Sequence, residues 1–144
     1  MLPDRNAIED AARIVHAAMP ATPQYAWPQL CERLRAEVWV KHENHTPVGA
    51  FKLRGGLVYF DGLRRREPGC RGVVAATRGN HGQSIGFAAR RHGLAATIFV
   101  PRGNSREKNA AMRALGARRI EHGADFQAAR EEADRYARAN GLHF

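Results

Sequence analysis

Residues 72–101 read GVVAATRGNHGQSIGFAARRHGLAATIFVP, and this stretch decides the fold class. Its two ends, residues 72–77 and 95–100, are short apolar runs of the kind that form buried parallel strands. Between them, a glycine-containing turn at residues 78–80 leads into a segment whose apolar residues recur on one helical face. A helix between two buried strands is a βαβ unit. The sequence therefore predicts an α/β fold with an open, mostly parallel sheet flanked by helices.

The same alternation of strands and helices continues on both sides of this unit. The elements expected there are helices at residues 6–19, 50–60, 104–115 and 125–140, and strands at residues 37–41 and 118–121. Asn6, Asn80 and Asn104 are expected to cap the helices that begin at them. Residues 142–144 resemble the start of a further strand, and nothing after them supplies its pairing. We therefore expect the chain to be a fragment or a truncated product.

The charge balance is the unusual feature of the composition. The 144 residues include 23 basic and 14 acidic side chains, and only Lys41, Lys52 and Lys108 among the basic ones are lysines. Such a balance favours anionic partners, which include nucleic acid, nucleotides and small carboxylated or phosphorylated ligands. A basic nucleic-acid-binding or nucleotide-binding α/β module is therefore kept as an alternative to an enzyme.

Other features exclude several classes of protein. Apolar residues make up 44% of the chain, which is ordinary for a globular domain. No apolar run approaches the roughly 20 residues of a membrane-spanning helix, and the charged first thirteen residues are not those of a secretory signal. Cys31 and Cys70 are far apart, which indicates reduced thiols. We expect a cytoplasmic protein.

The first segment that could carry chemistry is centred on Lys52, at the expected start of a helix. The positive end of the helix dipole disfavours the ammonium form of a lysine there, and the neighbouring Phe51 reduces hydration of the amine. Both effects favour a nucleophilic amine, so Lys52 is a candidate for a Schiff base. An ordinary surface lysine in the first turn is the alternative reading.

The second segment is the loop TRGNHGQ, residues 77–83, between a buried strand and a helix. Gly79 permits a tight turn, and the free amides at the start of the helix can bind an anion. In open α/β sheets, ligands bind beyond the carboxyl ends of the strands, where this loop is expected. The alternative reading is an ordinary turn with an asparagine cap at Asn80.

Taken together, the two segments resemble a known family. Residues 41–55, KHENHTPVGAFKLRG, look like the lysine segment of the pyridoxal-phosphate-dependent serine/threonine dehydratases, which share the fold of the tryptophan synthase β subunit. Residues 77–83 resemble the family's Ser-x-Gly-Asn-His-Ala/Gly-Gln loop and lie at the family's distance downstream. The resemblance extends from about residue 36 through Lys108 to residues 115–117, and so covers most of the chain.

The resemblance implies a role for each matching residue. Lys52 would bind the cofactor, pyridoxal 5′-phosphate, covalently and would later move the α-proton of the substrate. Phe51 would lie beside the cofactor ring, and Asn80 would hydrogen-bond its 3′-hydroxyl. The substrate carboxylate would be received by the loop residues Thr77, Arg78, Gly79, Asn80 and His81. The implied reaction is β-elimination from a hydroxy amino acid such as serine or threonine, which yields a 2-oxo acid and ammonia.

Some positions depart from the family pattern. Thr77 replaces the usual serine conservatively, whereas Arg78 stands where serine racemases of the family carry a serine as a second acid–base group. Racemisation is therefore expected less than elimination, and a cation at residue 78 could favour a substrate with an extra carboxylate. His81, which takes the place of a threonine in the sulfhydrylases, points to the dehydratase branch.

The resemblance also implies an organisation for the chain. Residues 1–54 would be the incomplete N-terminal part of the large cofactor domain, residues 55–71 a connecting helix and linker, and residues 72–144 the small α/β domain. The phosphate-binding loop and the group facing the pyridine nitrogen belong to the family's second half, so this chain is expected to be inactive alone. The parent protein is expected to be a homo-oligomer that takes a small amino-acid substrate and has no nucleic-acid or membrane partner.

Overall fold

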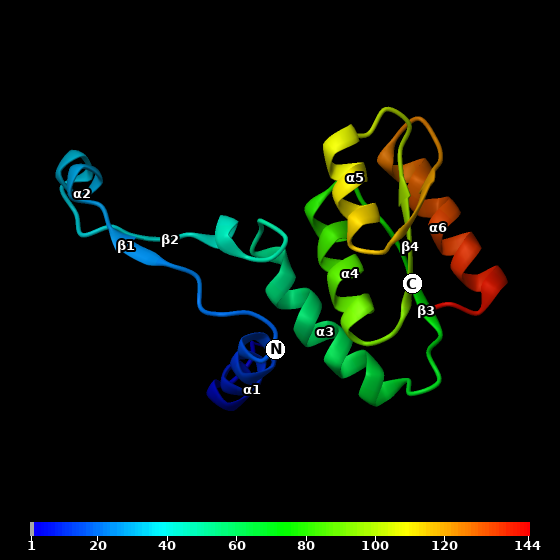
Figure 1. Ribbon diagram of the computed structural model, residues 1–144, viewed down its shortest axis with the longest axis horizontal. Helices are drawn as coiled ribbons and strands as arrows, with labels where there is room; N and C mark the ends of the chain where they lie inside the picture. Colours follow the sequence, from blue (N-terminus) through cyan, green and yellow to red (C-terminus); the bar gives the residue numbers. More distant parts are fainter. Residues whose placement is uncertain (1) are drawn as a thin grey trace.

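The computed structural model describes residues 2–144 and shows an α/β body with an extended arm. In chain order the elements are α1 (Arg5–His16), β1 (Gln24–Ala26), α2 (Pro28–Leu34), β2 (Trp39–Lys41), the 3₁₀ helix η1 (Glu43–His45), α3 (Lys52–Arg66), β3 (Gly72–Ala76), α4 (Asn80–Arg91), β4 (Ala95–Val100), α5 (Arg106–Ala114), β5 (Arg118–Glu121) and α6 (Phe126–Asn140). The elements from α3 onward form the body, and β1, α2 and β2 extend away from it (Figure 1). Helix α1, which precedes this arm in the chain, lies beside α3.

A parallel sheet with the order β3-β4-β5 is the centre of the body. Val74 pairs with Thr97 of β4, and Thr97 pairs with Arg118 of β5, which confirms the predicted parallel pairing of the first two strands. On the other edge of β3, His143 forms a parallel bridge with Val73. Of the strand start expected at residues 142–144, the structure thus shows a single bridging residue, His143.

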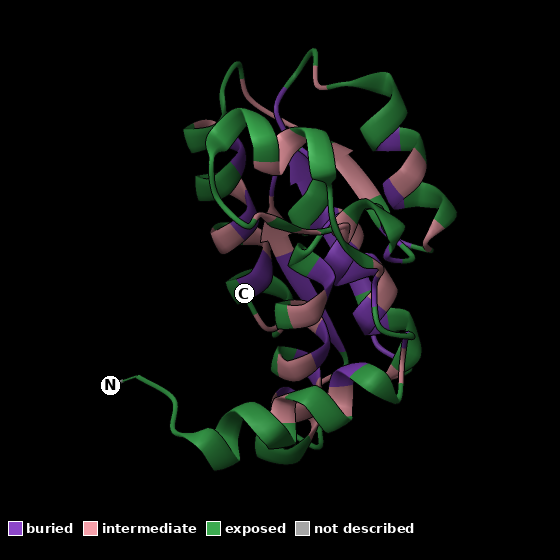
Figure 2. Cartoon of the chain, turned by 90° about the vertical axis from the view of Figure 1, so that its left-hand side faces the viewer, coloured by how far each residue is buried: buried purple, intermediate pink, exposed green. Residues whose placement is uncertain are grey.

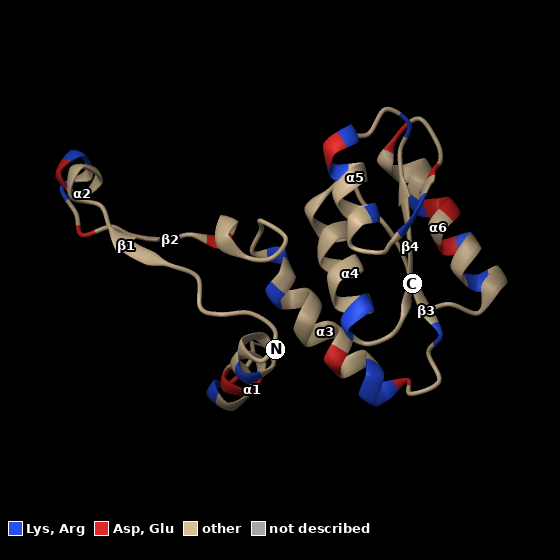
Figure 3. Ribbon diagram, viewed as in Figure 1, with Lys and Arg blue, Asp and Glu red and all other residues tan. Residues whose placement is uncertain are grey.

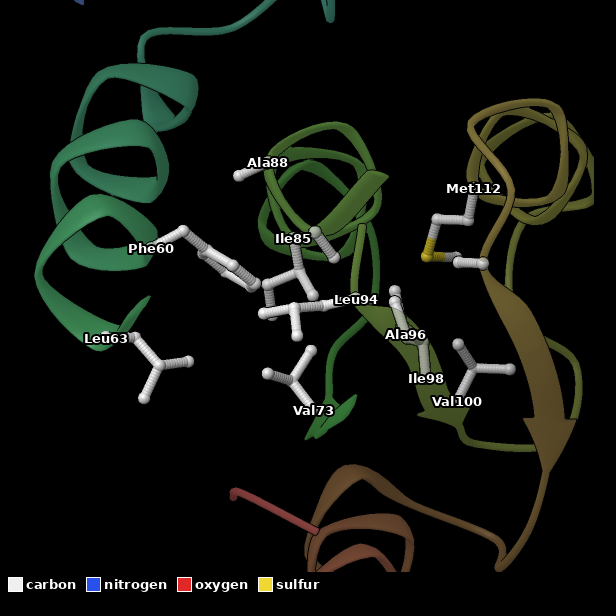
Figure 4. Close-up of a cluster of buried hydrophobic side chains, with 12 residues drawn as sticks. Phe60, Leu63, Val73, Ile85, Ala88, Leu94, Ala96, Ile98, Val100 and Met112 are labelled. Atoms are coloured by element: carbon white, nitrogen blue, oxygen red, sulfur yellow. The ribbon is translucent and has the colours of Figure 1, made fainter. Parts of the chain in front are cut away.

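Helices cover both faces of this sheet. Alternate strand residues face opposite sides, as the pleat requires. Val73, Ile98 and Val100 pack against α3, α4 and α5, and Figure 4 shows these side chains converging with Phe60 and Met112. On the opposite face, the side chains of Val74 and Phe99 pack against the alanines of α6, Ala129, Ala133 and Ala137. The α/β architecture expected from the sequence is thus confirmed.

Helix α3 connects the body to the N-terminal part of the chain. Its buried residues Leu53 and Leu57 contact Val15 and Met19, at the end of α1 and just after it. Figure 2 shows that burial is concentrated in the body, whereas most of α1 is exposed. The N-terminal helix therefore contributes a small cluster of its own near its end, whereas Ile8 in its first half is 58% exposed.

The arm was only partly predicted. The strand expected at residues 37–41 is shorter, Trp39–Lys41, and it pairs antiparallel with β1 instead of joining the parallel sheet. Neither β1 nor α2 was expected, because a three-residue strand and a seven-residue helix are too short to show a period. Tyr25 and Trp39 remain more than half exposed on this arm.

The predicted caps of α1 and α5 are wrong by two residues and by one residue, respectively. The cap of α1 is Asp4, whose carboxylate accepts a hydrogen bond of 2.8 Å from the amide of Ala7, and not Asn6. The cap of α5 is Ser105 and not Asn104. In each case a nearby polar side chain accepts the hydrogen bond from the helix start, and the local sequence offers more than one residue of a capping type.

Charged side chains are spread over the arm and the body. Lysine and arginine positions occur on α1, α2, α3, α5 and α6 with acidic residues between them (Figure 3). On α6, Asp134 and Arg138 form one of these pairs at 2.7 Å between carboxylate and guanidinium. No helix within residues 2–144 is long and apolar enough to cross a membrane.

Candidate active site

A pocket of about 400 Å³ lies between α3, β3 and the first turn of α4. Its walls are largely apolar and include Phe60, Val73 and Ile85. Polar groups lie on the same lining: the amine of Lys52, the ring of His81, and the side chains of Tyr59 and His143. An apolar pocket with a few convergent polar groups is the usual form of a small-molecule site.

Lys52 is the first residue of α3, as the sequence predicted for the start of a helix. Its ammonium nitrogen lies 5.8 Å from the centre of the Phe51 ring, and Phe51 itself is 65% exposed. One turn further along the same helical face are Gly55 and Gly56, which also line the pocket. A Cβ at Gly55 would meet no atom within 4 Å, so the space beside Lys52 is open.

The loop after β3 is held by the buried Thr77. Its amide donates to the carbonyl oxygen of Phe99 at 3.0 Å, and its hydroxyl accepts a hydrogen bond of 3.1 Å from the amide of Gly79. The expectation that Asn80 caps α4 is wrong, because Asn80 is the first helical residue and Gly79 precedes it. Since Gly79 has no side chain, the first amides of α4 keep the capacity to bind an anion.

Two of the predicted site residues meet in one pocket. Lys52 and His81 both line it, although they are 29 positions apart in the sequence. His81 is exposed overall; the hydration that its ring does lose lowers its pKa, and the charge of Lys52 lowers that pKa further. The imidazole of His81 is therefore held towards its neutral form.

The remaining predicted residues lie around this pocket without lining it. Thr77 and Gly79 are buried within the loop, whereas Arg78 and Asn80 are exposed beside it. Phe51 is exposed at the start of α3. The structure thus places the two predicted segments next to each other and leaves the individual roles of these residues as predictions.

Other residues at the site were missed by the sequence analysis. The hydroxyl of Tyr59 is 2.6 Å from Nε2 of His143, whose Nδ1 is 3.2 Å from a carboxylate oxygen of Glu67. Tyr59 follows Lys52 by two helical turns, and this spacing on one face could have identified it. His143 could not have been found in that way, because it reaches the pocket through sheet pairing.

Lys108 also contacts the predicted loop. A Cβ at Gly79 would lie 2.6 Å from Cδ and 3.3 Å from Nζ of Lys108, so this lysine lies directly against the loop. Because Gly79 has no side chain, the Lys108 side chain can lie in this space. The ammonium group adds positive charge beside the free amides of α4.

A partly buried ion pair anchors the segment that precedes α3. Arg54 donates two hydrogen bonds to the carboxylate of Glu43, at 2.7 and 2.9 Å, and Thr22 donates a third at 2.7 Å. These contacts hold the pKa of Glu43 at about 2, against an ordinary value of 4.5. Because Arg54 is two residues after Lys52, this cluster ties the start of α3 to η1.

The geometry fits the cofactor that the sequence suggested. Pyridoxal phosphate needs a primary amine for its aldehyde and apolar walls for its ring. Lys52 supplies the amine, and the walls of the pocket are largely apolar. The residues of the pocket are therefore compatible with pyridoxal phosphate.

Comparison with known proteins agrees with this class. The family model described as "Pyridoxal-phosphate dependent enzyme" matches residues 16–144. The chain therefore belongs to the pyridoxal-phosphate dependent enzymes, and the resemblance noted in the sequence is confirmed.

Individual relatives narrow the comparison to threonine dehydratases. The chain is 34% identical to the biosynthetic L-threonine dehydratase IlvA of Haemophilus influenzae, over 96% of this chain and 27% of that protein. It is 33% identical to the mitochondrial threonine dehydratase of Schizosaccharomyces pombe, over 89% of this chain and 21% of that protein. The chain thus spans about a quarter of the length of the curated relatives it matches.

Solved structures show the same fold. An aspartate racemase that depends on pyridoxal 5′-phosphate aligns with a TM-score of 0.90 and 26% identity, over 99% of this chain and 46% of that one. A threonine deaminase of Solanum lycopersicum aligns with a TM-score of 0.79 and 28% identity, over 98% of this chain and 42% of that one. The architecture described above is therefore that of these pyridoxal-phosphate enzymes.

Proposed function

We propose that this protein acts in the β-elimination of a hydroxy amino acid such as threonine or serine, which gives a 2-oxo acid and ammonia. The observation that carries the proposal is that Lys52 and His81, the last residue of the loop at residues 77–81, line one apolar pocket. The 34% identity to a threonine dehydratase supports the choice of reaction. The domain boundaries at residues 54 and 72 remain part of the proposal.

The proposed roles follow from where the residues lie. The amine of Lys52 would hold pyridoxal phosphate and then accept the α-proton of the substrate. The free amides at the start of α4 would bind the substrate carboxylate, with Thr77 keeping the loop in shape. Asn80 would hydrogen-bond the 3′-hydroxyl of the cofactor, and Phe51 would lie beside its ring. When bound, the cofactor supplies the electron sink for this chemistry.

His81 has a distinct electrostatic part in this scheme. Its pKa is lowered by lost hydration and by the charge of Lys52, so it adds little positive charge to the pocket at neutral pH. A neutral imidazole can donate a hydrogen bond through one ring nitrogen and accept through the other. In the proposal His81 helps to orient the substrate carboxylate, while the α-proton goes to Lys52 Nζ.

Racemisation is a second candidate, because the aspartate racemase aligns with a TM-score of 0.90. A racemase needs a second acid–base group on the far face of the substrate. Arg78 occupies the loop position at which the resemblance expects a serine in racemases, and an arginine side chain cannot be deprotonated in proteins. This residue favours elimination over racemisation.

We also propose that the 144-residue chain alone has no catalytic activity and binds the cofactor weakly. The chain matches only 27% of the H. influenzae enzyme, and the resemblance assigns the phosphate loop and the partner of the ring nitrogen to the family's second half. A misplacement of about 1 Å can lower a rate on the order of 10²-fold. Turnover by this chain near a typical enzyme's roughly 10 s⁻¹ would contradict this part of the proposal.

The reaction is tested with the protein as its complete gene encodes it. L-threonine, L-serine and 3-hydroxyaspartate are offered with and without pyridoxal phosphate, and the 2-oxo acid and the enantiomers of the amino acid are measured. We expect 2-oxo acid from at least one substrate and its loss in Lys52→Arg. Enantiomer exchange without 2-oxo acid would support the racemase, and activity unchanged in Lys52→Arg would refute the assignment of Lys52.

A further inference from the structure

Ser84 links the two segments of the site, and neither the motifs nor the proposed reaction uses it. It lies in α4, one turn beyond the loop, and is 1% exposed. Its hydroxyl donates a hydrogen bond of 3.0 Å to the carbonyl oxygen of Lys52. A serine inside a helix commonly bonds to its own preceding turn, whereas this one bonds to a neighbouring helix.

Gly56 provides the space for this hydroxyl. A Cβ at Gly56 would lie 2.1 Å from Oγ of Ser84 but 3.4 Å from its Cβ. The first distance is a severe clash, and the second is ordinary contact. Gly56 and Ser84 are therefore a matched pair: the hydroxyl fits only because α3 carries no side chain at residue 56.

The start of α3 needs such an external contact. Phe51, the residue before Lys52, makes no capping hydrogen bond through its side chain. Helix ends without caps fray, and Lys52 is in the first turn. On one side, Arg54 ties this turn to Glu43. On the other side, Ser84 ties it to α4, the helix that begins with the loop of the site.

We propose that Ser84 is a positioning residue, whose hydrogen bond to the carbonyl of Lys52 keeps the Lys52 amine in register with the loop at residues 77–81. This inference rests on the proposed role of Lys52. It concerns the backbone of Lys52 and not its side chain, so Ser84 acts without touching a substrate.

The effect of Lys52 on His81 provides a readout that is independent of turnover. The charge of Lys52 contributes to the lowered pKa of His81, after lost hydration as the larger cause. If Ser84 holds Lys52 in place, Ser84→Ala should let the ammonium move away while the hydration of His81 stays the same. The pKa of His81 should then rise part of the way to its ordinary value.

The experiment is an NMR titration of His81 in the 144-residue chain, with wild type, Ser84→Ala and Ser105→Ala compared. Ser105 is the only other serine of the sequence and caps α5, so its variant is the matched control. In parallel, the protein encoded by the complete gene, as wild type and as each variant, is reacted with pyridoxal phosphate, and labelling of Lys52 is compared with that of Lys41 and Lys108. We expect Ser84→Ala to lower the preference for Lys52 about fivefold, the effect of one hydrogen bond.

A second pair of variants covers the case in which Ser84→Ala disturbs folding. Gly56→Ala should destabilise the chain, because its methyl group meets the hydroxyl at 2.1 Å, and Gly56→Ala/Ser84→Ala should recover the fold. The recovered double variant should still show the raised pKa of His81, because the hydroxyl is missing. This outcome separates positioning from packing.

The results are decisive in both directions. A wild-type titration of His81 and wild-type labelling of Lys52 in folded Ser84→Ala, or in the folded double variant, would overturn the inference. If pyridoxal phosphate shows no preference for Lys52 even in wild type, the proposed function fails instead. The titration of His81 then still decides whether Ser84 positions Lys52.

Discussion

The ion pair between Glu43 and Arg54 should stabilise the fold in a pH-dependent way. The side chains of the two residues are 22% and 28% exposed, and three hydrogen bonds from Arg54 and Thr22 reach the carboxylate. The pKa of Glu43 is lowered to about 2, chiefly by the hydrogen bonds from Arg54. Glu43→Gln keeps the shape of the side chain and removes the charge.

The sign and size of the effect follow from this shift. A carboxyl with a lower pKa in the folded than in the unfolded state contributes stability above the unfolded value, here 4.5, and loses it as the pH falls towards about 2. At about 1.36 kcal/mol per pKa unit the full shift corresponds to about 3 kcal/mol. Water at this partly exposed pair reduces the expected contribution to on the order of 1–2 kcal/mol.

The assay is urea unfolding of wild type and Glu43→Gln at pH 7 and at several values below 4.5. We expect the wild type to be more stable by about 1–2 kcal/mol at pH 7 and the difference to shrink at acidic pH. Glu32→Gln, at an exposed glutamate of α2, is the control and should change little. Equal unfolding free energies for wild type and Glu43→Gln across the whole pH range would refute the reasoning.

Two further predictions concern the body. Gly82→Ala should lower the free energy of unfolding by about 1–3 kcal/mol, because a Cβ there would lie 2.4 Å from the sulfur of the fully buried Met112. Urea unfolding measures this difference, and a variant as stable as wild type would contradict the packing described for Gly82. The carbonyl oxygen of His143 accepts a hydrogen bond of 2.7 Å from the amide of Val74. Tyr59→Phe removes the hydrogen bond of 2.6 Å between the tyrosine hydroxyl and the His143 ring, and should therefore weaken the pairing of His143 with β3. Hydrogen exchange at Val74 should become about fivefold faster, as expected for one lost hydrogen bond, and an unchanged rate would contradict this contact.

The strands of the body were predictable because their signal is continuous. The runs at residues 95–100 and 118–121 coincide with β4 and β5. Five consecutive residues of β4 are buried, as is typical of a central strand in a parallel sheet that is covered on both faces. By contrast, the arm depends on antiparallel pairing between residues 24–26 and 39–41, and neither segment is long enough to show a strand pattern by itself.

The candidate site likewise has some features that local sequence could predict and others that depend on contacts between distant segments. Lys52 and His81 could be named from the sequence, because their segments resemble the lysine segment and the substrate loop of a known family. Their convergence on one pocket depends on the packing of α3 against α4, which the sequence did not specify. Ser84 is a case of this kind: a serine among apolar helix residues is unremarkable until Gly56 is placed opposite it.

The central claim, that Lys52 is the residue that binds pyridoxal phosphate, can be tested by one measurement. The protein encoded by the complete gene is incubated with pyridoxal phosphate, reduced with borohydride and digested, and the label on Lys41, Lys52 and Lys108 is quantified by mass spectrometry. The account predicts that Lys52 carries most of the label and that Lys52→Ala loses it without a gain at the other two. An equal distribution over the three lysines would contradict the account.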